Sequence, residues 1–206
     1  MTERWTGLSE HYYTARPQAA HDEAEFTATL RGMELRFVTD AAVFSRERVD
    51  FGSALLIEAM RIAPADTVLD LGCGYGPIGL MAARLAPEGR VYMVDVNERA
   101  AALAQRNLAE NGVTNAEVRV GDGLEPVWGI RFDKVLTNPP IRAGKAAIYR
   151  MLDDAHQALV PGGSIWVVIQ TKQGAPSMKK KLQELFGNVA DVEREAGYHV
   201  FTAVKQ

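Results

Sequence analysis

A run of closely spaced glycines carries much of the chemical information in this chain. Residues 68–71 form an apolar, strand-like run, and Gly72, Cys73, Gly74 and Gly76 follow it, ahead of a helix expected over residues 78–85. Glycines lack a Cβ atom, so they let the backbone turn sharply and let a ligand lie directly against it. The alternative is a glycine loop that only tightens a turn.

The glycine spacing and Asp70 indicate the kind of ligand. The dinucleotide pattern G-x-G-x-x-G needs its third glycine one residue later than Gly76, where this chain has Pro77. Asp70 lies two residues before the first glycine and would repel a pyrophosphate, so it favours a ligand with cationic groups. S-adenosylmethionine, which carries an ammonium and a sulfonium group, is such a ligand.

Two further carboxylates follow strand-like runs. Asp95 comes after residues 91–94, and Asp122 with Gly123 comes after residues 118–120. The carboxyl ends of parallel strands meet at one edge of a sheet, where ligands bind in open α/β folds. We expect Asp95 to accept from ribose hydroxyls and Asp122 from the exocyclic amine of adenine. The alternatives are a helix cap at Asp95 or Asn97 and an ordinary turn at Asp122.

The next strand-like run, residues 133–136, leads into a corner rich in hydrogen-bond acceptors. Asn138, Pro139 and Pro140 follow it, and the two prolines remove backbone donors and fix φ. The remaining carbonyls suit a neutral –NH2 group whose lone pair is delocalised into a base or an amide. Holding both of its hydrogens aims that lone pair at an electrophilic methyl group, which is catalysis by orientation. A rigid turn is the alternative.

Elements that would position these residues alternate along the chain from about residue 50. Strand-like runs at 68–71, 91–94, 118–120, 133–136, 165–169 and 200–204 alternate with amphipathic helical stretches. One helical face includes residues 148–159 and is expected to end at the Pro-Gly-Gly sequence of residues 161–163, with His156 on its solvated side. Alternation of this kind predicts a largely parallel sheet with helices on both faces.

Two hairpins are expected in addition. Residues 188–195 and 198–205 have no helix between them, which predicts an antiparallel hairpin at one edge of the sheet. Residues 25–30 and 34–38 alternate around an Arg-Gly turn, which predicts a small hairpin that packs on the rest of the chain. We therefore divide the chain into an N-terminal extension, residues 1–45, and a larger domain, residues 46–206.

The composition limits the class of protein. The chain has 206 residues, with 23 Lys and Arg against 26 Asp and Glu and a net charge of −3, so no overall basic field attracts it to nucleic acid. Its single cysteine excludes an internal disulfide framework, and its four histidines have no metal-ligand spacing, so we expect no metal. No stretch resembles a signal peptide or a membrane span, and we expect a cytoplasmic enzyme.

These motifs together resemble the class I S-adenosylmethionine-dependent methyltransferases that act on exocyclic amines. The resemblance extends to the small-subunit ribosomal RNA guanine-N2 methyltransferase family, above all to its short members, and covers nearly the whole chain. The segments that carry it are residues 11–13, 42–45, 50–52, 70–76 and 138–141, with Asp95 and Asp122.

The resemblance implies a Rossmann-like, seven-stranded mixed sheet with an antiparallel last strand, and S-adenosylmethionine as cofactor. The residues expected to bind the cofactor are Asp70, Gly72, Cys73, Gly74, Gly76, Asp95, Val96, Asp122 and Gly123. Asn138, Pro139 and Pro140 are expected to hold the target amine. The expected substrate side comprises Phe44, Ser45, Asp50, Gly52, Ile141, Arg142 and Lys145, of which the two cations are placed to meet RNA phosphates.

Two departures from the family pattern leave the substrate open. Many relatives that act on flipped bases have an aromatic residue where this chain has Ile141, and the longer ones carry a duplicated N-terminal domain. The expected substrate is guanine N2 of ribosomal RNA, free or within a ribosomal subunit, and a homodimer is left open. Other hypotheses are methylation of a glutamine amide in a translation factor, adenine-N6 methylation, a nucleotide-dependent oxidoreductase and a non-catalytic RNA-binding module.

Overall fold

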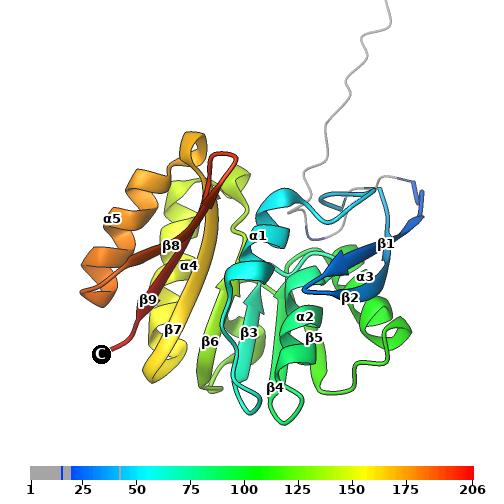
Figure 1. The fold of residues 1–206 in the computed structure, drawn as a ribbon, viewed down its shortest axis with the longest axis horizontal. Coiled ribbons are helices and arrows are strands. Elements are labelled where there is room, and N and C mark those ends of the chain that lie inside the picture. Colours follow the sequence, from blue (N-terminus) through cyan, green and yellow to red (C-terminus); the bar gives the residue numbers. More distant parts are fainter. Residues whose placement is uncertain (1–14, 16–19, 42) are drawn as a thin grey trace, which may run out of the picture.

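The computed structural model describes residue 15, residues 20–41 and residues 43–206. The predicted sites at residues 11–13 and at Ala42 lie outside these residues. In the described part, a large sheet has the order β5-β4-β3-β6-β7-β9-β8 (Figure 1). Its strands are β3 (Thr67–Leu71), β4 (Arg90–Asp95), β5 (Ala116–Val120), β6 (Phe132–Thr137), β7 (Leu159–Gln170), β8 (Ala190–Glu195) and β9 (Tyr198–Val204).

The strand directions confirm the predicted mixed sheet. The strands β3 to β7 pair in parallel, β9 runs antiparallel to β7, and β8 pairs with β9 at the edge as the predicted hairpin. The turn between β8 and β9 uses Ala196 and Gly197, both with positive φ (47° and 79°). Two consecutive positive φ angles match the twist of a tight hairpin.

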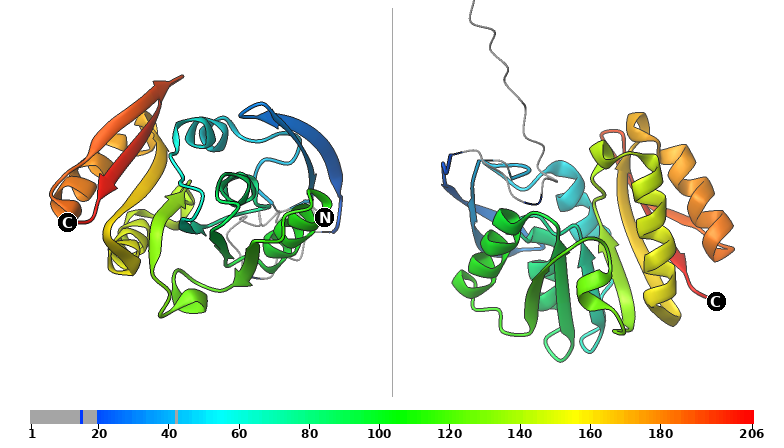
Figure 2. Two further views of the ribbon diagram at one scale, coloured as in Figure 1. Left: turned by 60° about the horizontal axis from the view of Figure 1, so that its bottom comes forward. Right: turned by 180° about the vertical axis from the view of Figure 1, so that it is seen from behind.

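Helices cover both faces of the sheet (Figure 2). Successive strand residues point to opposite faces, so Val68 packs with α1, α2 and α3, whereas Leu69 and Leu71 pack with α4 and α5. The helices are α1 (Phe51–Ala59), α2 (Pro77–Leu85), α3 (Glu98–Glu110), α4 (Lys145–Ala158) and α5 (Ala175–Phe186), with short 3-10 turns η1 (Glu125–Val127), η2 (Ile141–Ala143) and η3 (Thr171–Gln173). None of the helices described is both long and apolar enough to cross a membrane.

The end of α4 differs from the sequence prediction in two respects. Leu159 begins β7, opposite Phe132, instead of ending the helix, and the register shift that follows accommodates Pro161 and the two glycines after it. His156 is half-buried instead of solvated, because its ring meets the edge of Phe186 at 4.7 Å between centroids. Burial lowers the pKa of this imidazole.

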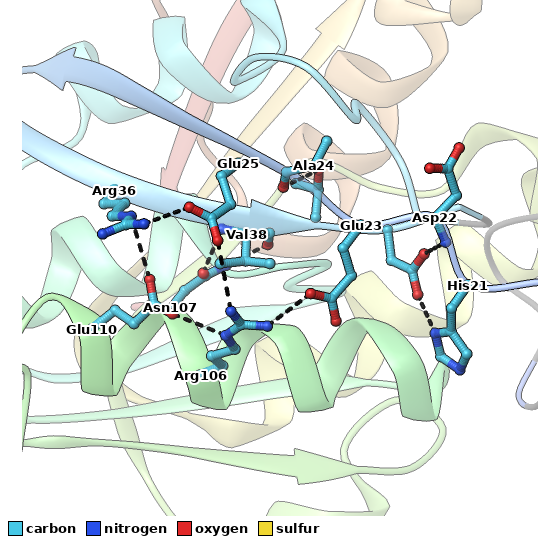
Figure 3. A network of polar contacts seen from close by, with 12 residues as sticks. His21, Asp22, Glu23, Ala24, Glu25, Arg36, Val38, Arg106, Asn107 and Glu110 are labelled. Carbon is cyan, nitrogen blue, oxygen red and sulfur yellow. Dashed lines mark hydrogen bonds and ion pairs between the residues drawn. The ribbon is translucent and has the colours of Figure 1, made fainter.

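The N-terminal hairpin of β1 (Ala24–Leu30) and β2 (Met33–Thr39) packs on α3, as Figure 3 shows. Asn107 of α3 is fully buried; it accepts from the Val38 N–H at 2.7 Å and donates to the carbonyls of Val38 (3.0 Å) and Tyr75 (2.9 Å). Asn111, one turn later, makes the same pair of bonds to the backbone of Arg36 near the surface. Two asparagines of one helix thus bind the backbone of β2.

We expect Asn107→Ala to lower the free energy of unfolding by about 2–4 kcal/mol, because buried backbone groups of Val38 and Tyr75 lose their partner. Asn111→Ala, the matched change in a half-buried setting, should cost about 1 kcal/mol or less, because water replaces the lost bonds. Urea denaturation of the two variants measures the difference. Equal costs would contradict a buried linkage at Asn107.

Candidate functional site

A cavity of about 440 Å³ opens at the carboxyl ends of the parallel strands. Its lining brings together most of the residues singled out in the sequence: Phe44, Asp50, Gly72, Cys73, Gly74, Asp95, Val96, Asp122, Gly123, Asn138, Pro139, Pro140, Ile141 and Arg142. The other five, Ser45, Gly52, Asp70, Gly76 and Lys145, are not in the lining.

The glycine loop is anchored to the end of β4. The N–H groups of Gly72 and Cys73 both donate to the carbonyl of Val94, at 2.9 and 3.0 Å. The Asp95 carboxylate accepts from the N–H of Gly74 at 2.8 Å and, through its other oxygen, from the N–H of Asn97 at 2.9 Å. The loop is therefore held in place by the protein alone.

Positive φ angles explain the glycines of this loop. Gly72 and Gly74 have φ of 78° and 57°, and a Cβ atom added at either would meet open space, so the backbone angle requires glycine there. Gly76 has a φ of 98°, so its backbone also favours glycine, and an added Cβ atom would lie 2.8 Å from the Met93 side chain and 3.2 Å from the Ala104 Cβ atom. Gly76 is the N-cap residue of α2 and does not line the cavity.

Asn97 caps α3, which agrees with the alternative interpretation of this segment as a helix cap. Its side-chain oxygen accepts from the N–H groups of Arg99 (3.0 Å) and Ala100 (3.1 Å), and the side chain is fully buried. The cap leaves the Asp95 carboxylate at the cavity wall. Burial raises the pKa of Asp95, although the backbone N–H groups that bind it act in the opposite direction.

Asp70 lies behind the glycine loop. It shares the sheet face of Val68, so its carboxylate points beneath the first turn of α2 and accepts from the N–H of Gly79 at 2.7 Å. The side chain is fully buried, and its Oδ1 atom has no hydrogen-bond partner among the described residues. Burial, and then the nearby charge of Asp95, raise the pKa of Asp70 to about 7.

Asp122 lines the cavity with a largely exposed side chain. Its side chain is 69% exposed and forms an ion pair with Arg150 at 3.1 Å, so Arg150 is partly neutralised there. Cys73, by contrast, is buried in the loop, and burial raises the pKa of its thiol. A thiol that stays protonated is a poor nucleophile. Among the described residues, no group of three or more His, Cys, Asp or Glu could hold a metal ion.

The acceptor corner after β6 is held from two sides. The Thr137 hydroxyl donates to the Leu71 carbonyl at 2.8 Å, which fixes the end of the strand. The Asn138 side-chain nitrogen donates to Asp50 Oδ1 and to Ser53 Oγ, both at 3.1 Å. Asp50 is the N-cap residue of α1.

Ser53, Gln173 and Tyr198 are among the residues of this cavity wall that sequence reasoning missed. A signal for Ser53 was present, because Asp50 is a typical N-cap residue and a capping side chain accepts from a backbone N–H two or three residues later, here that of Ser53. Tyr198 can pack against the start of α1 because Gly52 has no side chain; an added Cβ atom there would lie 2.9 Å from the tyrosine ring. That close approach explains Gly52, which the resemblance had placed at the substrate entrance.

We expect Asp70 to give this protein a pH-dependent stability. Because the pKa of about 7 exceeds the ordinary value of 3.8, the folded state keeps a proton that the unfolded state loses, so stability falls as the pH rises towards 7 and is constant above it. Asp70→Asn removes this dependence. The free energy of unfolding of the variant relative to the natural protein should rise by about 1–3 kcal/mol between pH 5 and pH 7.5.

Urea denaturation without added ligand, at intervals over this pH range, measures the relative change. Parallel pH curves for the two proteins would show that Asp70 is ionised in the folded state throughout.

Comparison with known proteins agrees with this geometry. The chain is 41% identical over 200 residues to an uncharacterized protein, YbxB, of Bacillus subtilis, and the match covers 96% of this chain and 100% of that protein. It is 37% identical over 171 residues to ribosomal RNA large subunit methyltransferase G of Streptomyces avermitilis, with 81% of this chain and 44% of that protein covered.

A solved structure is similar over almost the whole chain. It is the T. thermophilus 16S rRNA N2 G1207 methyltransferase (RsmC) in complex with AdoMet and guanosine, with a TM-score of 0.81 and 29% identity over 92% of this chain and 52% of that one. This chain thus spans about half the length of the two ribosomal RNA methyltransferases. The family described as Methyltransferase small domain matches residues 34–202. The chain therefore belongs to this family, which confirms the predicted class I S-adenosylmethionine-dependent methyltransferase.

Proposed function

We propose that this chain transfers a methyl group from S-adenosylmethionine to guanine N2 of ribosomal RNA. The observation that carries the proposal is the acceptor corner of Asn138 and Pro139, which lines the same cavity as the glycine loop and Asp95. The similar T. thermophilus enzyme, which modifies N2 of a guanine in 16S rRNA, supports this choice of substrate.

The residues at the loop end of the cavity fit the cofactor. Gly72 and Gly74 leave open space where side chains would otherwise lie, and Asp95 presents a carboxylate suited to ribose hydroxyls. We assign Asp122 and Gly123, which line the same cavity, to the adenine. Asp70 lies behind the loop and outside the cavity lining, where a bound cationic ligand would favour its ionised form.

The chemistry needs few protein groups. Bound S-adenosylmethionine supplies an electrophilic methyl group on a positively charged sulfur. Asn138 and Pro139 offer carbonyl oxygens, and neither Pro139 nor Pro140 has a backbone N–H that would compete for the amine. The new N–C bond forms as the C–S bond breaks, the sulfur leaves as a neutral thioether, and the extra proton on nitrogen is lost afterwards.

The substrate side of the cavity combines aromatic, aliphatic and cationic side chains. Phe44, Tyr198 and Ile141 line it, and Arg142 extends from the same corner. Lys145, one turn further, is exposed at the start of α4. We assign base stacking to the two aromatic rings, because Ile141 has none, and phosphate contact to the two cations.

Asn138→Ala should lower kcat for methyl transfer by about 100-fold or more, because the amine loses an acceptor fixed in the reacting geometry. The dissociation constant of S-adenosylmethionine, measured by calorimetry, should stay within a few-fold of that of the natural protein.

The assay compares labelled methyl transfer to ribosomal RNA, ribosomal subunits and release factor from cells that lack the gene. Asn188→Ala, far along the chain where it binds the backbone of β9, is the matched control. Transfer only to protein would favour a glutamine amide, and an intact rate in Asn138→Ala would refute this reacting end.

Tyr198→Leu should raise KM for the RNA substrate about 5-fold or more, because stacking of a base on an aromatic ring contributes about 1–3 kcal/mol. The same change at Tyr92, a ring of β4 that packs against Phe132 outside the cavity lining, should leave KM unchanged. Steady-state kinetics with the RNA varied at saturating cofactor measures both. An unchanged KM in Tyr198→Leu would assign stacking to Phe44 alone.

A further inference from the structure

The side-chain amide of Asn138 is held in one orientation by its neighbours. Its nitrogen lies 3.1 Å from Asp50 Oδ1 and 3.1 Å from Ser53 Oγ. An ionised carboxylate can only accept hydrogen bonds, so the nitrogen end of the amide must face Asp50. The amide oxygen is consequently the end directed away from Asp50.

The same two residues form the start of α1. Asp50 Oδ1 also accepts from the N–H of Ser53 at 3.0 Å, and the Asp50 carbonyl accepts from the N–H of Ala54 at 3.0 Å. Ser53 is buried and Gly52 packs against the Tyr198 ring, so this helix end is fixed in the wall of the cavity. One carboxylate oxygen thereby joins a helix cap to the acceptor corner.

We infer that Asp50, together with Ser53, is a positioning residue that keeps the Asn138 amide in its accepting orientation. In the flipped orientation, the amide oxygen would face the carboxylate and the amide –NH2 would meet the –NH2 of the substrate, so two donors would oppose each other. The inference rests on the proposed function, because it concerns an amine acceptor. It assigns to Asp50 a function in the transfer step that binding of the cofactor does not require.

Asp50→Ser tests this inference without removing the helix cap. Serine caps helices as well as aspartate does, but its single, shorter side-chain oxygen serves the cap and leaves Asn138 without its carboxylate partner. We expect kcat to fall about tenfold or more, with the dissociation constant of S-adenosylmethionine within threefold and the thermal midpoint within about 2 °C. Asp66→Ser, which changes a carboxylate that binds the N–H of Ala63 away from the cavity, is the matched control and should keep full activity.

Two more variants separate positioning from stability. Asp50→Ala removes both functions, so it should lower kcat and also lower the thermal midpoint by about 2–4 °C. Asp50→Asn keeps a side-chain oxygen that can cap the helix and accept from Asn138 at the same time, as Oδ1 of the aspartate does. It should retain most of the kcat that Asp50→Ser loses, a difference that helix capping alone would not produce, because both variants keep the cap.

The amide can also be observed without any substrate. In the protein labelled with 15N-asparagine, the two side-chain hydrogens of Asn138 should be slow to exchange with solvent, and this protection should be lost in Asp50→Ser and kept in Asp50→Asn. Full protection or an unchanged kcat in Asp50→Ser would overturn the inference, as would losses of cofactor affinity and thermal midpoint that match the loss of kcat. If the natural protein methylates none of the RNA substrates, the proposed function fails, and the exchange measurement still decides the orientation.

Discussion

The link between the glycine loop and the end of β4 is the constraint on which the site depends. The Val94 carbonyl accepts two N–H groups of the loop, and the Asp95 carboxylate bridges Gly74 to Asn97. These bonds fix the loop, the strand end and the start of α3 relative to one another. Since Asn97 caps α3 at the same point, the open space above Gly72 and Gly74 is formed before any ligand arrives. A preformed site avoids the entropic cost of ordering a loop upon binding.

Segments from the N-terminal part of the chain complete this site. Asn107 connects β2 to the Tyr75 carbonyl in the glycine loop, and the Tyr75 ring packs edge-on against Phe37 at 5.7 Å. Asp50 connects the start of α1 to the acceptor corner. The hairpin is therefore part of the scaffold of the cavity, in line with the expectation that it packs on the rest of the chain.

The sequence predicted those parts of the site that depend on local spacing. Glycines after a strand, carboxylates at strand ends and the Asn-Pro-Pro corner all follow from the rule that parallel strands share one binding edge, and the cavity collects them there. The position of Asp70 beneath α2 could have been predicted by counting alternate residues along β3. The position of Tyr198 could not have been predicted, because Tyr198 lies 146 positions after Gly52, whose missing Cβ atom makes room for the tyrosine ring. His156 likewise depends on Phe186 in a different helix.

The state of the carboxylates explains why the proposed transfer depends on orientation more than on proton transfer. Asp95 uses both oxygens to hold backbone N–H groups, and the bonded oxygen of Asp50 holds both Asn138 and Ser53. Asp122, which also lines the cavity, lies in an exposed ion pair with Arg150. A base is not required before the transfer, since the sulfur leaves without charge and the proton becomes acidic only on the methylated nitrogen. The groups around the amine can therefore be acceptors fixed in place, and their alignment sets the rate.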